Sequence, residues 1–177
     1  MPDIVRYEIL DSLPTYGPMY IPVSEYNGAY YSEGFVVRFY TCENTNWVGN
    51  FQPGSTGLNA VYEFEHNIYV LVIAGGTCYL MNPDLQKPIS TFGVEYETVI
   101  KALDGRLILQ DSTDLTVFEV NGEYWHTERI SWDGIAELKL EGNLVSGLSY
   151  HPVGEDGEWV EFVVDLEKRS VKGGSYT

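Results

Sequence analysis

The sequence is poor in the residue types and motifs that carry most enzyme chemistry. It has two cysteines and three histidines in 177 residues, and it lacks the CxxC, HxH and HExxH spacings of zinc sites. It also lacks the Gly-Lys-Ser/Thr triplet of a phosphate-binding loop and the GxGxxG of a dinucleotide fold. The segment Gly147 to His151 starts like a serine-hydrolase elbow but ends in His instead of Gly. We therefore expect no metal, no cofactor and no enzymatic activity.

Basic residues are also scarce, with 10 lysines and arginines against 26 aspartates and glutamates, a net charge of −16. A field of this sign repels phosphate backbones, so we do not expect nucleic-acid binding. It speeds the encounter with a basic protein. An acidic surface can equally serve only to keep a protein dispersed.

Long apolar runs are missing, and no segment approaches the roughly 18 residues of a membrane span. The first ten residues, MPDIVRYEIL, carry acids early and lack the basic region and apolar core of a secretory signal. We therefore expect a bacterial protein of the cytoplasm that does not contact membranes. Cys42 and Cys78 lie in or beside predicted strands, and we expect two buried free thiols rather than a disulfide.

What the chain does contain is strand and turn signals. In the stretch 104–130, the tight-turn dipeptides Asp104-Gly105 and Asn121-Gly122 separate runs rich in β-branched and aromatic residues. Residues 136–141 alternate between apolar and charged with a period of two, and no stretch shows a helical stripe. These patterns predict a single all-β domain over 1–177 that is built from antiparallel meanders. We expect residues 1–34, rich in proline and tyrosine, to form an extended arm that packs on the body and adds one short strand.

The hairpin turns recur at a regular spacing. Their centres fall near residues 44, 84, 121 and 167, about 40 residues apart, which is typical of repeats built from a four-stranded meander. YVLVIAGGTCYLMNPDLQKPIS and LILQDSTDLTVFEVNGEYWHTERIS share the order strand, loop, strand, turn, strand. Residues 35–177 thus resemble the blades of β-propeller proteins of the kelch or WD type. The resemblance implies about four blade-like units. A β-sandwich or an open barrel with similar hairpins is the alternative.

One predicted strand carries candidate catalytic residues. Tyr124, His126 and Glu128 alternate along it and therefore share a face, with roughly 6.5–7 Å between alternate Cα atoms. On that face Glu128 would orient His126 as the general base of a hydrolase. A row of polar residues also arises simply because one face of a sheet meets water.

An acidic loop is the candidate metal site. Glu155, Asp156 and Glu158 stand among glycines between two predicted strands and bring three carboxylates together. The EF-hand spacing that holds calcium is absent, and such residues are also ordinary loop formers.

Fourteen tyrosines and four tryptophans supply large contact surfaces. We expect Trp47, Trp125 and Trp159, each on a predicted strand, to lie in the core. The aromatic residues expected to be exposed, and to mark a binding interface where they cluster, are Trp132, Tyr16, Tyr20, Tyr26 and Tyr30.

These observations favour a protein-binding domain without enzymatic activity. Charge and size suit an acidic inhibitor or immunity-type partner that neutralises a basic protein. The alternative is a carbohydrate-like small-ligand binder that uses exposed aromatic rings beside paired carboxylates. A hydrolase built on His126 and Glu128 is the third hypothesis. The oligomeric state and the identity of any partner stay open.

Overall fold

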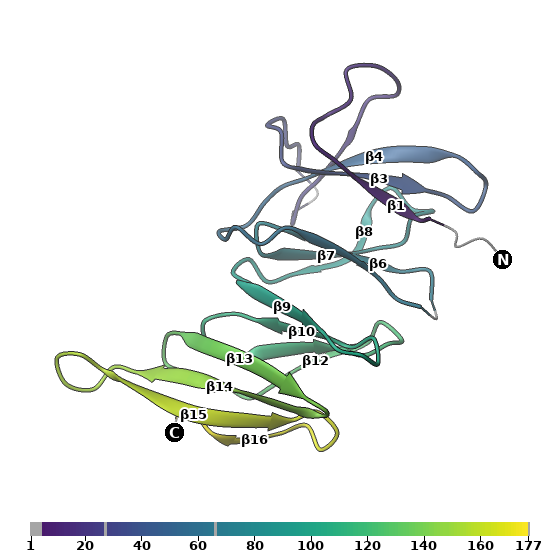
Figure 1. Ribbon diagram of the computed structural model, residues 1–177. Helices are drawn as coiled ribbons and strands as arrows, with labels where there is room; N and C mark the ends of the chain where they lie inside the picture. The colour runs from purple at the N-terminus through teal and green to yellow at the C-terminus, as the bar shows by residue number, and fades with distance from the viewer. Residues whose placement is uncertain (1–4, 27, 66, 177) are drawn as a thin grey trace. The chain divides into compact units, whose positions relative to one another are not determined.

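The computed structural model describes residues 5–26, 28–65 and 67–176, and these residues form strands and turns without a helix. Sixteen strands make four sheets of four strands each (Figure 1). The all-β fold class predicted from the sequence is therefore confirmed. No helix of the described chain is long and apolar enough to cross a membrane. The strands fall into two compact units, Met1–Glu95 and Tyr96–Thr177.

The first sheet of the first unit contains strands from both the N-terminal arm and the body. Its spatial order is β1-β3-β4-β2, and its members are β1 (Tyr7–Leu10), β2 (Ile21–Val23), β3 (Phe35–Tyr40) and β4 (Asn46–Phe51). Strand β1 pairs antiparallel with β3, and β2 pairs parallel with β4. The arm thus supplies both edge strands, where the sequence predicted one short strand.

The second sheet of this unit is a simple meander. It consists of β5 (Ala60–Glu63), β6 (Val70–Ala74), β7 (Thr77–Met81) and β8 (Pro88–Phe92). Every residue of β6 and β7 is buried, as the continuous apolar run of β6 indicates. Residues of both sheets share one core, in which the largest buried side chains are Phe39, Phe51, Tyr79, Met81 and Trp47.

The second unit contains two further meanders. One is formed by β9 (Thr98–Lys101), β10 (Leu107–Gln110), β11 (Leu115–Phe118) and β12 (Tyr124–His126). The other is formed by β13 (Ile135–Glu141), β14 (Leu144–His151), β15 (Glu158–Asp165) and β16 (Ser170–Gly173). The two sheets share a core that contains Ile108, Leu115, Val117, Val145, Phe162 and Val164.

The predicted repeat is present in the strand order. Each of the turns near 44, 84, 121 and 167 connects the third and fourth strands of one sheet in chain order. Three of the four sheets are meanders of consecutive strands. Within the described ranges no sheet closes on itself. Each of the four sheets thus corresponds to one of the repeats that the turn spacing of about 40 residues indicates.

Strand parity corrects one expectation about the core. Phe162 and Val164 of β15 point inward and are buried, so Trp159 and Val163 point outward. Trp159 is accordingly 50% exposed, and its predicted core position was wrong. Trp125 is partly buried against the core of its unit, and Trp47 is buried as predicted.

The cysteines are free thiols, as expected, but only one is buried. Cys78 lies on β7 and is fully buried. Cys42 is exposed because it lies in the turn between β3 and β4 rather than on either strand. Burial raises the pKa of the Cys78 thiol, and a hydrogen bond with Asp84 raises the pKa of Cys42.

The core of the second unit gives a first prediction. Phe162→Ala should lower the free energy of unfolding by about 3–5 kcal/mol, because it removes a fully buried ring and leaves a cavity. Val163→Ala, one residue along and exposed on the opposite face, is the matched control and should cost less than about 1 kcal/mol. Urea unfolding of both variants measures the difference. Equal losses would contradict the assignment of the two faces.

The thiols give a second prediction. Under native conditions a thiol reagent should modify one cysteine, Cys42, while Cys78 should react only after unfolding, because its sulfur is buried and its thiolate is disfavoured. Mass spectrometry of the labelled peptides identifies the site. Rapid modification of Cys78 in the folded protein would contradict the burial of β7.

Candidate functional site

Exposed aromatic rings gather at one corner of the second unit. The rings of Trp132 and Tyr176 meet edge to face with their centroids 4.7 Å apart, and those of Tyr150 and Trp159 do so at 5.4 Å. Gly134, two residues after Trp132, packs against the second pair: a Cβ atom there would lie 3.5 Å from Tyr150 Cβ and 3.6 Å from Trp159 Cη2. We call these four aromatic residues, together with Arg129, the aromatic corner.

Buried serines hold the backbone of the aromatic corner. The Ser131 hydroxyl donates to Gly134 O at 2.7 Å, and Tyr150 N donates to Ser131 Oγ at 3.1 Å. The Ser175 hydroxyl donates to Tyr150 O at 2.6 Å. Since both hydroxyls are buried and bonded, they fix the loop before β13, the end of β14 and the C-terminal segment to one another.

A left-handed glycine brings Tyr176 into place. Gly174 has a φ of +94°, and a Cβ atom there would lie 2.7 Å from Ile130 O. Only glycine fits this position without strain. The chain beyond it turns so that Ser175 N and Tyr176 N both donate to Ile130 O, at 2.9 and 3.1 Å. The ring of Tyr176 is thereby placed against Trp132.

Arg129 shows what the rings of the corner can bind. Its guanidinium carbon lies 4.6 Å from the Tyr176 ring centroid and 5.8 Å from that of Trp132. Its Nε donates to Ser131 O at 3.0 Å and its Nη2 donates to Trp132 O at 2.8 Å. The corner therefore already holds one cation by ring faces and carbonyl oxygens. Its outer surface stays accessible, with Trp132 42% and Tyr176 41% exposed.

Acidic side chains flank the corner along the chain. Asp133 follows Trp132, Glu158 precedes Trp159, and all of the predicted loop carboxylates, Glu155, Asp156 and Glu158, are exposed. Glu158 also lies 3.4 Å from His151 Nδ1. In the described part of the chain no three His, Cys, Asp or Glu side chains are grouped so that they would hold a metal ion. The carboxylates thus contribute negative charge beside the rings.

The structure brings together two of the three candidate catalytic residues. The ring of Tyr124 meets that of His126 edge to face, with centroids 5.8 Å apart. Strand β12 ends at His126, however, and Glu128 lies exposed in the irregular segment that follows. The ladder stops there because Leu115 N donates to the side-chain oxygen Thr127 Oγ1, at 3.1 Å, in place of the backbone oxygen of Thr127. The strand face on which Glu128 was expected to orient His126 is therefore not formed.

His126 is bonded to buried hydroxyls instead. Its Nδ1 lies 2.7 Å from Thr116 Oγ1, and that oxygen lies 2.6 Å from the hydroxyl of Tyr96. Thr116 is fully buried and Tyr96 nearly so, so neither hydroxyl is open to a substrate. This chain of hydrogen bonds joins the start of the second unit to β11 and β12.

The arm tyrosines belong to the first unit. Tyr16 and Tyr26 are almost fully exposed, as predicted, whereas Tyr20 and Tyr30 are half-buried. Trp132, the remaining residue expected to be exposed, belongs to the aromatic corner. The sequence did not indicate Arg129, Tyr150 or Tyr176 as its neighbours. The glycine pair before Ser175 was the one local signal that the chain turns sharply there.

No protein-family model matches this chain, and no curated protein matches it either.

A half-buried carboxyl, Asp114, whose charge interacts with His126, gives a prediction about pH. Burial, followed by the nearby charge of Asp111, raises the pKa of Asp114 above its ordinary value. The folded state then holds the proton more tightly than the unfolded state, so the contribution of Asp114 to stability is lost as the pH rises through its folded pKa. Asp114→Asn should therefore stabilise the protein at pH 7, and the gain should vanish below about pH 4.

Asp104→Asn is the matched control, with the opposite sign. A hydrogen bond from Arg106 lowers the pKa of Asp104, so this carboxylate contributes stability above its ordinary pKa and loses it as the pH falls. The variant should be less stable than the natural protein at pH 7. Thermal unfolding of both variants and of the natural protein is measured between pH 3 and 8. This range includes the ordinary carboxyl pKa of about 4. If both variants changed stability in the same direction at pH 7, the opposite pKa shifts of Asp114 and Asp104 would be refuted.

Proposed function

We propose that this chain is a protein-binding domain without enzymatic activity, and that the aromatic corner is the centre of its contact surface. The observation that supports this most directly is the exposure of Trp132, Trp159 and Tyr176 on a hydrogen-bonded β framework. Tryptophan and tyrosine dominate the energetics of protein interfaces. They bury large areas and lose little conformational entropy, and here the framework already holds their backbone.

We further propose that the partner is a basic protein. The net charge of −16 draws such a protein toward the chain from a distance. Asp133 and Glu158, next to the exposed tryptophans, then supply carboxylates for its lysines and arginines. An inhibitor or immunity-type role in the bacterial cytoplasm, in which this domain neutralises a basic protein, combines both features.

The test is an affinity capture with matched variants. The natural protein, a Trp132→Ala/Trp159→Ala variant and a Tyr16→Ala/Tyr26→Ala control are immobilised and exposed to lysate of the source cell at low and high salt. The control removes two exposed rings from the other unit. Mass spectrometry should find the same basic protein on the natural protein and on the control at low salt, with much less at high salt.

The loss of the two tryptophan rings sets how far the affinity for the partner should fall. Loss of a central interface ring typically costs about 2 kcal/mol or more, so the affinity of the tryptophan variant should fall at least about 30-fold. Far-UV circular dichroism checks that the variant is folded. Retention of the same partner by the tryptophan variant with unchanged affinity would refute the assignment of the surface.

A further inference from the structure

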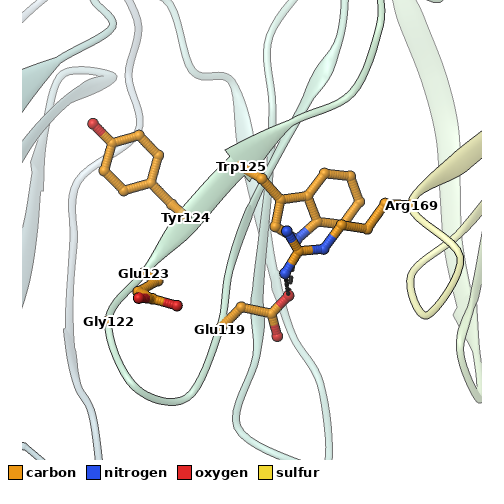
Figure 2. A pocket seen from close by; sticks show the side chains of 6 residues that line it. All are labelled: Glu119, Gly122, Glu123, Tyr124, Trp125 and Arg169. Carbon is orange, nitrogen blue, oxygen red and sulfur yellow. Dashed lines mark hydrogen bonds and ion pairs between the residues drawn. The ribbon is translucent and has the colours of Figure 1, made fainter.

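A second surface feature of the same unit is an open hollow beside β12. It encloses about 390 Å³ and is lined by Glu119, Gly122, Glu123, Tyr124, Trp125 and Arg169 (Figure 2). Figure 2 shows Arg169 reaching from a neighbouring turn over the indole of Trp125, while Tyr124 projects from the other side of the strand. The hollow shares no residue with the aromatic corner. Its volume lies within the range of small-molecule sites.

The walls of the hollow are fixed by three linked groups. Trp125 Nε1 donates to Glu119 Oε1 at 2.8 Å. Arg169 Nη2 approaches the same oxygen at 3.4 Å, and its guanidinium carbon lies 5.2 Å from the indole centroid. The floor is the β11–β12 turn, closed by the bond from Glu119 N to Glu123 O at 2.8 Å. A ligand would thus meet side chains that are already ordered.

The groups that line the hollow have unused hydrogen-bonding capacity. Within the described residues, Glu119 Oε2 accepts no hydrogen bond, and Arg169 uses only Nη2 of its guanidinium. Arg169 is 56% exposed, so its remaining N–H groups are accessible. The hollow therefore offers an acceptor and several donors side by side, beside aromatic rings.

This combination excludes most ligand classes. An anion would meet Glu119, Glu123 and a strongly acidic protein. A cation would meet Arg169, whose guanidinium already occupies the ring face and the carboxylate that would attract it. An apolar ligand would cover Glu119 Oε2 and the unused N–H groups of Arg169 without giving them a hydrogen-bond partner. A neutral ligand rich in hydroxyl groups satisfies all of them, because each hydroxyl both donates and accepts.

We propose that the hollow binds a neutral saccharide. Its hydroxyls donate to Glu119 Oε2 and the Glu123 carboxylate and accept from the free N–H groups of Arg169. This site is separate from the protein-binding surface and adds a ligand of a different class.

Saturation-transfer NMR tests the proposal. The probes are glucose, galactose, mannose, N-acetylglucosamine and cellobiose, with methylguanidinium as a cationic competitor. We expect saturation transfer to at least one saccharide and none to methylguanidinium. Arg169→Ala should weaken binding of that saccharide at least tenfold. Glu123→Gln, an exposed change that leaves the linked groups of Glu119 intact, should weaken it several-fold.

Trp132→Ala is the control, and it should bind the saccharide as the natural protein does. No transfer to any saccharide, stronger transfer to methylguanidinium, or equal binding by Arg169→Ala would each overturn the proposal. The affinity capture that tests the aromatic corner does not depend on Arg169, so a failure of either site is recognised separately.

Discussion

The structure depends on the packing of sheet against sheet, which buries one apolar face of each sheet. In each unit two four-stranded sheets share one apolar core, and the period of two along each strand decides which side chains enter it. On β15 this rule places Phe162 and Val164 inside and leaves Trp159 outside. The exposed tryptophan is therefore a direct consequence of the register that buries its neighbours.

Because the strands are committed to the cores, both proposed binding sites lie where strands end. The aromatic corner is built from the loop before β13, the C-terminal end of β14, the start of β15 and the segment after β16. The hollow is built from the β11–β12 and β15–β16 turns. In both places an arginine rests on a tryptophan ring and is held by an oxygen acceptor.

Local patterns predicted much of the fold. Turn dipeptides such as Asn121-Gly122 located the hairpins, and alternation in 136–141 identified β13 despite its helix-forming residues. What could not be predicted depends on contacts between distant segments. The meeting of Trp132 with Tyr176 and the parallel pairing of β2 follow from backbone bonds to distant partners. The departure of Glu128 from β12 follows from the hydrogen bond of Leu115 N to the Thr127 side chain. Sequence spacing alone contains no information about such bonds.

Hydrogen exchange of the four indole N–H groups tests most directly that the aromatic corner is an accessible surface. Trp47 donates to Pro83 O and Trp125 to Glu119, whereas the indole N–H groups of Trp132 and Trp159 have no acceptor in the described chain. NMR should therefore show two slowly exchanging indole protons, from Trp47 and Trp125, and two that exchange rapidly. Slow exchange of Trp132 and Trp159 would mean that the corner is covered and would contradict the account.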